Sequence, residues 1–165
     1  MKIYKVGGAV RDKLMGLEPK DTDWVIVGSS ISELEKKGFQ QVGKDFPVFL
    51  HPDTKEEYAL ARKETKTGKG YKGFKFDFSP DITLEEDLKR RDFSINAIAF
   101  EFSKQKIYDY FDGIKHIKEK ELHLLHENSI RDDPSRLIRC ARYASRLGFK
   151  IANKSLEQSQ RIVQS

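Results

Sequence analysis

The sequence contains a single cysteine, Cys140, and so lacks the residues for an internal disulfide framework or for a zinc site built from several cysteines. It also lacks long hydrophobic runs, since no apolar stretch approaches the ~18 residues that a membrane-spanning helix needs. Met1 is followed by lysines, glycines and further charges instead of the apolar segment of a secretory signal. No internal repeat or low-complexity tract is found. These absences exclude a membrane span and lead us to expect a cytoplasmic protein.

Hydrophobic residues make up 38% of the 165 residues and include 11 phenylalanines. This share is enough for a packed core and argues against wholesale disorder. The length suits one domain, or one domain and the start of a second.

Positive charge is unevenly distributed along the chain. Residues 1–127 contain 23 Lys and Arg and 23 Asp and Glu, whereas residues 128–165 contain 8 and 3, so the net charge of +5 arises in the C-terminal segment. A second basic run, residues 62–75, holds six Lys and Arg and one Glu. Two basic segments on a near-neutral body favour a polyanionic partner, most often nucleic acid or nucleotide. A lysine-rich solubilising surface is the alternative interpretation.

The apolar pattern predicts an α/β fold in which a small sheet comes first and helices follow. Strands are expected over residues 3–6, 24–27, 48–50, 57–61 and 107–110. Helices are expected over residues 9–15, 31–37, 83–99, 132–147 and 155–163, and Thr83 with Glu86 fits a capping box at the start of the third. Turns are expected at residues 51–54 and 112–113, and a mobile loop at 65–73. Composition and pattern both change near residue 128, which suggests a domain boundary there.

Asp21 and Asp23 stand directly before the expected strand at residues 24–27. Residues two apart on an extended chain face the same side, so these two carboxylates are able to share divalent cations. In two-metal phosphoryl transfer, such ions clamp the attacking and the leaving oxygens. An ordinary pair of turn aspartates is the alternative.

Gly7 and Gly8 join an expected strand to an expected helix, and Arg11 lies near the start of that helix. Glycines allow backbone N–H groups to approach an anion closely, and a helix N-terminus favours phosphate. The segment is not a Walker A loop, because no Gly-Lys-Ser/Thr follows. The alternative is a simple glycine turn.

Two later segments carry polar groups suited to a nucleotide. In residues 89–97, the donors and acceptors of Arg91, Ser94 and Asn96 suit a sugar and a triphosphate, although a charged helix face would look similar. In residues 132–147, four arginines form one helical stripe opposite an apolar stripe, and Asp133 with Arg136 offers an acceptor and donor edge for a base. A solvated arginine face is the alternative there.

Together, the segments GGAVRD (7–12), Asp-x-Asp (21–23), RRDFSINA (90–97) and DDPSRLIR (132–139) resemble the class II tRNA nucleotidyltransferases, which are CCA-adding enzymes, and the bacterial poly(A) polymerases. These families belong to the DNA polymerase β-like nucleotidyltransferase superfamily, and the resemblance covers essentially the whole chain. It implies an α/β head domain at residues 1–127, with a small mixed sheet and flanking helices. It further implies an all-helical partial neck at residues 128–165.

The resemblance also implies roles for individual residues. Asp21 and Asp23 would be catalytic and would hold Mg²⁺, and Glu57 matches the position of a further active-site carboxylate. The incoming nucleotide would be bound by Gly8, Arg11, Arg91, Asp92, Asn96, Asp133, Arg136 and Arg139.

Within this nucleotide-binding set, each group of residues would contact a different part of the nucleotide. Gly8 and Arg11 would contact the triphosphate, and Asp92 and Asn96 would help to read the ribose. Asp133 and Arg136 would pair with the base edge of CTP or ATP as a template made of side chains.

The function implied is the addition of CCA to the 3′ end of tRNA from CTP and ATP. A bacterial poly(A) polymerase, which shares this head, is one alternative, and a non-catalytic nucleotide- or RNA-binding fragment is another. The basic run at 62–75 corresponds to the flexible loop of the family, which argues against an enzyme that adds only C. Family members are much longer and have helical body and tail domains that hold the tRNA, so we expect a truncated chain.

Overall fold

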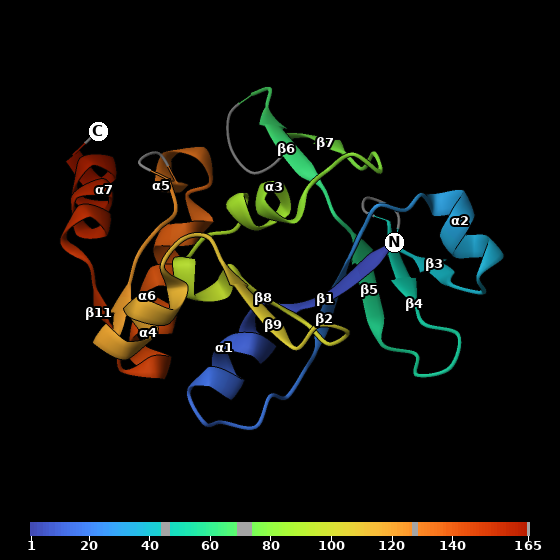
Figure 1. Cartoon of the computed structure of the whole chain (residues 1–165). Helices are drawn as coiled ribbons and strands as arrows, with labels where there is room; N and C mark the ends of the chain where they lie inside the picture. The colour runs from blue at the N-terminus through green and yellow to red at the C-terminus, as the bar shows by residue number, and fades with distance from the viewer. Residues whose placement is uncertain (44–46, 69–73, 127–128, 165) are drawn as a thin grey trace.

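The computed structural model describes residues 1–43, 47–68, 74–126 and 129–164. Its centre is a seven-stranded mixed sheet with the strand order β3-β4-β5-β2-β1-β8-β9 (Figure 1). Neighbouring strands are antiparallel except for β2 and β5, which run parallel. The sheet strands are β1 (Lys2–Val6), β2 (Asp23–Val27), β3 (Gln40–Val42), β4 (Val48–Leu50), β5 (Glu57–Leu60), β8 (Ile98–Glu101) and β9 (Lys106–Asp109). The expected α/β fold with a small mixed sheet is confirmed.

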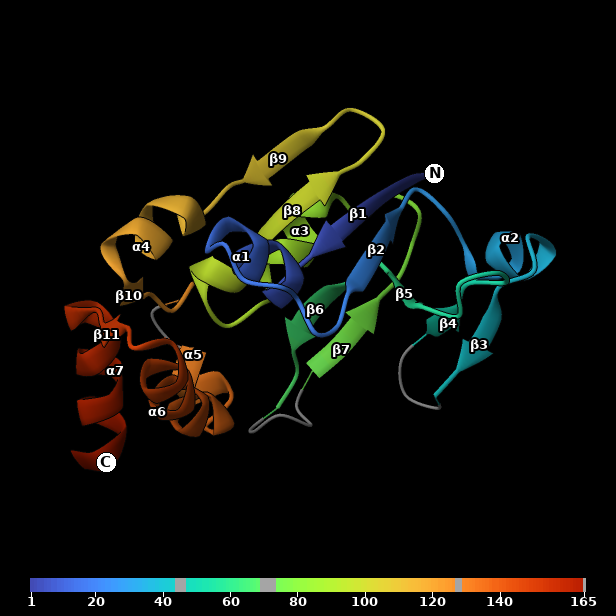
Figure 2. The same ribbon diagram turned by 90° about the horizontal axis from the view of Figure 1, so that it is seen from below.

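Two short strand pairs accompany the sheet. β6 (Lys63–Lys66) and β7 (Phe74–Asp77) form an antiparallel hairpin, and β10 (Glu121–Leu122) pairs in parallel with β11 (Lys150–Ile151). The helices are α1 (Gly8–Leu14), α2 (Ile31–Lys36), α3 (Leu84–Lys89), the 3₁₀ turn η1 (Ser94–Asn96), α4 (Gly113–Glu119), α5 (Ser129–Asp132), α6 (Ser135–Leu147) and α7 (Asn153–Gln164). Figure 2 shows α4 to α7 gathered beyond one end of the sheet, and α2 beside β3 and β4 at the other.

The two faces of the sheet bury separate clusters, and β2 contributes to both. Val25 packs on one face with Leu84 and Leu88 of α3, and Ile26 packs on the opposite face with Leu34 of α2. Successive residues of a strand face opposite sides. Asp23 therefore shares the α3 face with Val25, and this alternation directs its carboxylate towards the cavity described below.

A third cluster joins the C-terminal helices to the sheet domain. Phe93 and Leu122 pack in it with Cys140 of α6 and with Phe149. Burial raises the pKa of the Cys140 thiol to about 11, so this thiol behaves as a packing group. The shared core holds α6 beside the sheet domain.

The C-terminal segment departs from the all-helical neck that we expected. β11 lies within it and pairs with β10 across the expected boundary at residue 128, with Leu122 aligned to Ile151. The expected helix over 132–147 is also interrupted, because α5 ends at Asp132 and α6 begins at Ser135. Pro134 lies between them, and a proline has no N–H to continue the hydrogen bonding of a preceding helix.

The helix expected over residues 83–99 is correct at its start and wrong at its end. The capping box between Thr83 and Glu86 is formed, but α3 stops at Lys89 and the chain continues as η1 and then β8. Residues 92–99 are all buried, so this stretch has no solvent face. Phe93 and Ala97 suggested helical spacing only because almost every residue around them is buried.

Other expectations need smaller corrections. Instead of a plain turn at 112–113, Asp112 is the N-cap residue of α4, which begins at Gly113. The Asp109 carboxylate accepts hydrogen bonds from the N–H groups of Gly113 and Ile114 at 2.8 and 2.9 Å. The loop expected over 65–73 starts as strand, since β6 extends to Lys66. Residues 69–73 of that loop lie outside the described residues.

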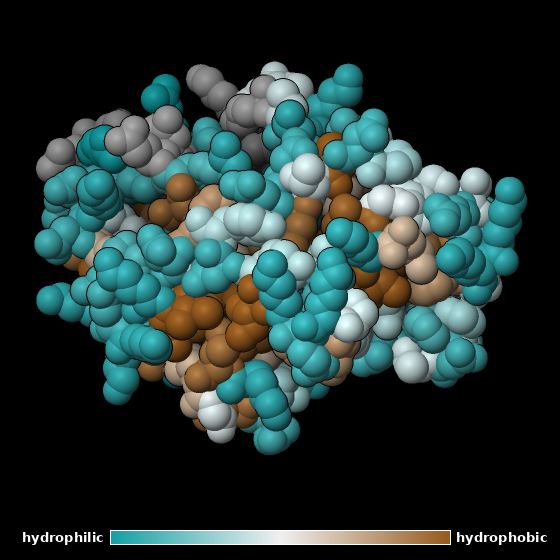
Figure 3. All heavy atoms as spheres, viewed as in Figure 1, coloured by the Kyte–Doolittle hydropathy of each residue, from teal (hydrophilic) through white to brown (hydrophobic). Residues whose placement is uncertain are grey.

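Hydrophobic side chains also reach the surface, as Figure 3 shows below the centre of the view, around α1. An apolar groove of about 560 Å³ lies there, and Leu14, Phe102 and Ile107 are exposed along it. None of the site residues predicted from the sequence lines this groove. Within the described ranges, every helix is too short or too polar to cross a membrane.

Candidate active site

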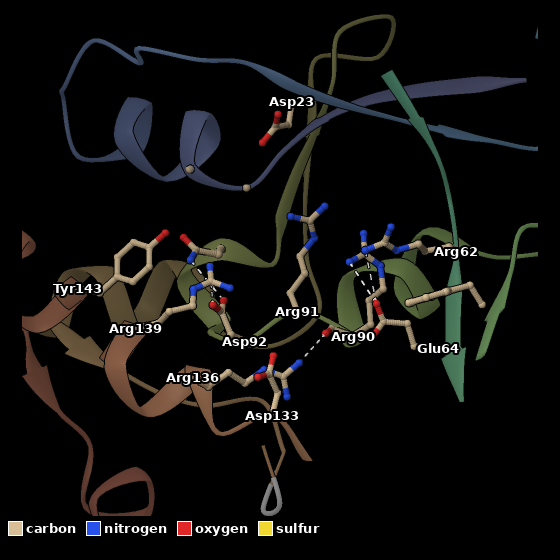
Figure 4. Close-up of a pocket in the computed structure, with 14 residues that line it drawn as sticks. Asp23, Arg62, Glu64, Arg90, Arg91, Asp92, Asp133, Arg136, Arg139 and Tyr143 are labelled. Atoms are coloured by element: carbon tan, nitrogen blue, oxygen red, sulfur yellow. Dashed lines mark hydrogen bonds and ion pairs between the residues drawn. The ribbon is translucent and has the colours of Figure 1, made fainter. Parts of the chain in front are cut away.

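A cavity of about 360 Å³ opens on the α3 face of the sheet, between the sheet domain and α6 (Figure 4). It brings together five separate parts of the chain: the turn after β1, the start of β2, the β6–β7 hairpin, the segment that follows α3, and the start of α6. The described residues that line it are Gly7, Gly8, Asp23, Arg62, Glu64, Phe76, Arg90, Arg91, Asp92, Asn96, Asp133, Arg136, Arg139 and Tyr143. Eight of the sequence-predicted site residues are among them.

The glycine turn forms one wall, where β1 ends and α1 begins. Gly7 has φ +73° and ψ −140°, a backbone conformation that residues with a side chain rarely adopt. A Cβ atom at Gly7 would lie 3.2 Å from Nη1 of Arg91, and one at Gly8 would lie 3.3 Å from Nη2 of Arg11. The turn is therefore made of glycine for two reasons, its backbone angles and the two guanidinium groups packed against it.

Arg11 lies behind this turn. Its side chain is 3% exposed, its Nη1 donates to Oδ1 of Asn96 at 2.6 Å, and its Nη2 forms an ion pair with Asp12 at 2.9 Å. Arg11 is not among the described lining residues of the cavity, whereas Asn96 is. The structure thus places Arg11 as a support for the glycine turn and for Asn96, and its contact with a triphosphate stays a prediction.

The predicted carboxylates lie at the start of β2. Asp21 and Asp23 are both exposed, and Asp23 lines the cavity while Asp21 precedes the strand. β2 and β5 pair in parallel with Trp24 aligned to Tyr58, which makes Asp23 and Glu57 neighbours one position earlier. Both also line a smaller adjoining cavity of about 240 Å³. The fold therefore brings Glu57 beside Asp23, from a strand more than thirty residues away in sequence.

Three arginines, here called the arginine group, add to the positive charge that Arg136 and Arg139 also give the cavity. Arg62, Arg90 and Arg91 all line it, and Figure 4 shows Arg91 directed towards Asp23. Burial, reinforced by the neighbouring charge of Arg90, lowers the pKa of Arg62 to about 10. Burial also lowers the pKa of Arg91, against the opposing effect of Asp87. Cations held this close together under desolvation favour the binding of an anion.

Asp92 connects this group to α6. Its Oδ1 accepts from the N–H of Phe93 at 2.7 Å, and its Oδ2 forms an ion pair with Nη2 of Arg139 at 2.8 Å. Asp92 is 5% exposed, whereas the Arg139 side chain is 47% exposed. The pair links the sheet domain to α6 across the cavity.

Asp133 and Arg136 lie at the start of α6, on the floor of the cavity in Figure 4. Oδ1 of Asp133 accepts from the N–H and the hydroxyl of Ser135, at 3.1 and 2.6 Å, as a side chain does before a helix. Arg136 is buried and donates to the carbonyl oxygens of Ser129 and Arg90 at 3.1 and 3.3 Å. Arg136 is thus not on a solvated face, because backbone carbonyls hold its guanidinium at the cavity.

Sequence reasoning named Gly7 only as part of the glycine turn, and it did not assign five other lining residues to a site: Arg62, Glu64, Phe76, Arg90 and Tyr143. Arg62 stands at the start of the basic run, which was the available signal for the hairpin residues. Tyr143 had no signal in the sequence. Its ring lies 5.4 Å from the guanidinium carbon of Arg11 and 5.9 Å from that of Arg139, so it packs between cations of the sheet domain and of α6.

A separate group of metal-ligating side chains lies elsewhere in the described part of the chain. The ligand atoms of Glu119, Glu121 and His123 are all within 4.8 Å of one another. None of the three lines the cavity, so this group is distinct from Asp21 and Asp23.

The sequence of the chain is similar to those of known proteins. The chain matches the family described as the poly A polymerase head domain over residues 3–123. It is 54% identical over 168 residues to the "Multifunctional CCA protein" of Pasteurella multocida (strain Pm70), in an alignment that covers 100% of this chain and 40% of that protein.

Solved structures agree with this match. One is described as a tRNA nucleotidyltransferase complexed with a primer tRNA and an incoming ATP analog, with a TM-score of 0.76, 32% identity, and coverage of 99% of this chain and 47% of that one. Another is the Bacillus stearothermophilus CCA-adding enzyme in complex with CTP, with a TM-score of 0.74, 32% identity, and coverage of 99% and 39%.

The chain therefore belongs to the poly(A) polymerase head-domain family of nucleotidyltransferases, the family that its motifs resemble. Nucleotidyltransferases of this family generally use a divalent metal. The chain spans 40% of the length of the Pasteurella relative and 41% of that of a Vibrio vulnificus relative.

Proposed function

We propose that the chain carries the nucleotidyl-transfer site of a CCA-adding enzyme, which extends the 3′ end of tRNA with CTP and ATP. The observation that supports this most is the single cavity lined by Asp23, the glycine turn, the arginine group and the start of α6. Each of these parts comes from a different one of the motifs that the family shares. We further propose that residues 1–127 form the head and residues 128–165 the first part of the neck. Because its proposed substrates are tRNA, CTP and ATP, we also propose that the protein acts in the cytoplasm.

Asp21 and Asp23 would hold Mg²⁺, with Glu57 as a neighbouring third carboxylate. The donor set fits this ion, since Mg²⁺ prefers carboxylate oxygens, and all three side chains are exposed. When bound, the metal would lower the energy of charge developing on the reacting phosphate oxygens. The protein's part would be to hold these carboxylates close together at the starts of β2 and β5.

The incoming triphosphate would lie along the glycine turn, within reach of Arg91. Gly8 has no side chain to block the approach of an anion to the backbone, and Arg91, which packs against Gly7, would donate to the same anion. Asp92 and Asn96 lie next to Arg91 and would contact the ribose. Both are nearly buried, at 5% and 6% exposure, and are held by Arg139 and Arg11.

Asp133 and Arg136 would read the base, with Arg139 as a further nucleotide contact. Reading would require Arg136 to offer its donors to a base edge, and those donors now bind two backbone carbonyls. A base that failed to match would leave buried polar groups unpaired, which is a costly arrangement and a source of discrimination.

In the reaction, the terminal 3′-hydroxyl oxygen of the RNA would attack the α-phosphorus of the nucleotide. A new bond would form between that oxygen and the α-phosphorus, and the hydroxyl proton would pass to solvent. The bond from the α-phosphorus to the oxygen bridging to the β-phosphate would break, and pyrophosphate would leave with the bonding electron pair. Positioning and electrostatic stabilisation carry most of such catalysis. Arg91 and its neighbours would bind the phosphates as this charge develops.

A bacterial poly(A) polymerase is the second candidate, because the family that matches is itself described as a poly A polymerase head domain. A non-catalytic nucleotide- or RNA-binding fragment is a third. The products separate all three: three added nucleotides and a stop, a long A tail, or no addition.

The test is incorporation of labelled CTP and ATP into a tRNA transcript that lacks its CCA end, with Mg²⁺ and with products resolved at single-nucleotide length. Discrete addition of C, C and A supports the proposal. Asp23→Asn should abolish addition, and Asp81→Asn, an exposed carboxylate outside the cavity, is the matched control. A chain that binds CTP with Mg²⁺ but adds nothing would have an intact site and need further parts of the protein. Absence of both binding and addition would refute the proposal.

A further inference from the structure

Asp87 of α3 is a charged side chain with no exposed surface, at 0% exposure. It has no assigned role, and it does not line the cavity. A carboxylate this deeply buried is costly unless cations and hydrogen-bond donors surround it. The identity of those partners shows what the carboxylate does.

Within the described part of the chain, the partners of its carboxylate oxygens belong to cavity-lining residues. Oδ1 accepts from the backbone N–H of Arg62 at 3.0 Å and from Nη2 of Arg90 at 3.3 Å. Oδ2 forms an ion pair with Nη2 of Arg91 at 3.6 Å. One carboxylate therefore contacts three of the five arginines that line the cavity: Arg90 and Arg91 through their side chains, and Arg62 through its backbone N–H.

These contacts join two structural elements. Arg90 and Arg91 follow α3 directly, whereas Arg62 is the residue before β6, at the root of the β6–β7 hairpin. Glu64 of β6 completes the link from the other side, with its Oε1 at 3.5 Å from Arg62 and 3.9 Å from Arg90. The root of the hairpin and the arginine group are thus fixed relative to each other through Asp87.

We propose that Asp87 is a positioning residue, which holds Arg90 and Arg91 in place for the phosphates of the incoming nucleotide and ties them to the root of the β6–β7 hairpin. This inference rests on the proposed function, since it takes the arginine group as the phosphate site. A planar guanidinium binds phosphate through directed pairs of N–H groups, so its orientation matters as well as its charge.

Two accounts of Asp87 predict opposite results for Asp87→Asn. If Asp87 only balances charge, its neutralisation leaves the cavity one unit more positive, and anions should bind more tightly. If Asp87 positions the arginines, the loss of its ion pairs lets them reorient, and anions should bind more weakly. The asparagine side chain is nearly the same size and its carbonyl can still accept from Arg62, so the fold should persist.

The experiment measures the binding of CTP and of inorganic tripolyphosphate, each with Mg²⁺, by isothermal titration calorimetry on the full chain. We expect Asp87→Asn to weaken both by about tenfold, which corresponds to about 1.4 kcal/mol. Asp87→Glu keeps the charge but displaces the carboxylate, and should also weaken both. Glu85→Gln, an exposed carboxylate on the same helix, should leave binding unchanged.

A double-mutant cycle adds a readout that loss of folding would not imitate. In an Arg91→Met background, Asp87→Asn should have a much smaller effect on tripolyphosphate binding, because one of the groups that it positions is already gone.

Each other outcome contradicts the inference. Tighter or unchanged binding by Asp87→Asn, with nucleotide addition intact in the wild type, would refute the positioning role and leave the proposed function standing. Unfolding of both Asp87 variants would show that the carboxylate serves folding instead. A wild-type chain that binds neither probe would overturn the inference and the proposed function together.

Discussion

Gly7→Ala tests whether the glycine turn and Arg91 act together, because the structure separates its effect on stability from its effect on binding. Gly7 has φ +73°, and the added Cβ would lie 3.2 Å from Nη1 of Arg91. Gly16 is a matched control, since it has φ +76° and a Cβ there would meet nothing within 4 Å. Both substitutions strain the backbone, and only one disturbs the cavity.

The expected losses of stability and of CTP affinity follow from the backbone strain and from the contact with Arg91. A side chain at a glycine-type φ costs about 1–3 kcal/mol, and each kcal/mol lowers the Tm of a chain of this length by about 2–4 °C. The contact at Gly7 is tighter than an ordinary contact by a few tenths of an ångström, and the end of a flexible arginine can yield to it. The steric cost in stability is therefore small, and the consequence is a displaced guanidinium.

Thermal unfolding measures the effect of each substitution on stability, and CTP titration measures its effect on binding. Both variants should melt at a lower temperature than the wild type. Gly7→Ala alone should bind CTP more weakly, by about tenfold, which is the loss expected when part of a charge-assisted hydrogen bond is given up. Equal CTP affinity in Gly7→Ala and Gly16→Ala would refute the reasoning, because the Arg91 contact would then have no part in binding.

Three further predictions follow from the same structure. Asp23→Asn should lower Mg²⁺-dependent nucleotide addition by about a hundredfold or more, because stabilisation of the transition state by the metal is worth several kcal/mol. It should not lower the Tm, because the Asp23 side chain is exposed. A smaller loss of addition in single-turnover assays would contradict the metal role. Gly113→Ala should destabilise the chain by about 1–3 kcal/mol in urea unfolding, since the added Cβ would overlap the Ser94 carbonyl oxygen and the Ile98 side chain. Unchanged stability would show that α4 can shift freely. Burial, with a contribution from the charge of His123, lowers the pKa of His116 in the folded chain. The stability that this shift contributes is fully present above the unfolded-state pKa of about 6.5 and should be lost as the pH falls towards the folded-state pKa. In melting curves recorded across this pH range, His116→Gln should show a smaller change of Tm with pH.

The sequence by itself determined the α/β class, the capping box of α3 and the identity of most cavity residues. Asp23, Asp92 and Arg136 could be named because each sits in a motif whose residues are adjacent along the chain. Local chemistry also placed β2 correctly, since a continuous apolar run of four residues favours a buried strand. In each case, the residues that determine the local structure or the motif lie within a few positions of one another along the chain.

The tertiary structure alone decided which residues of distant segments meet. Sequence spacing could not show that β5 lies parallel to β2 and brings Glu57 beside Asp23, or that Tyr143 packs between Arg11 and Arg139. It also misjudged residues 92–99, because burial from several directions removes the periodicity on which helix and strand predictions depend. Asp87 is the clearest case. On a helical wheel it is one acidic residue among several, and only the packing of α3 against the arginine group makes it a buried carboxylate among three cavity-lining arginines.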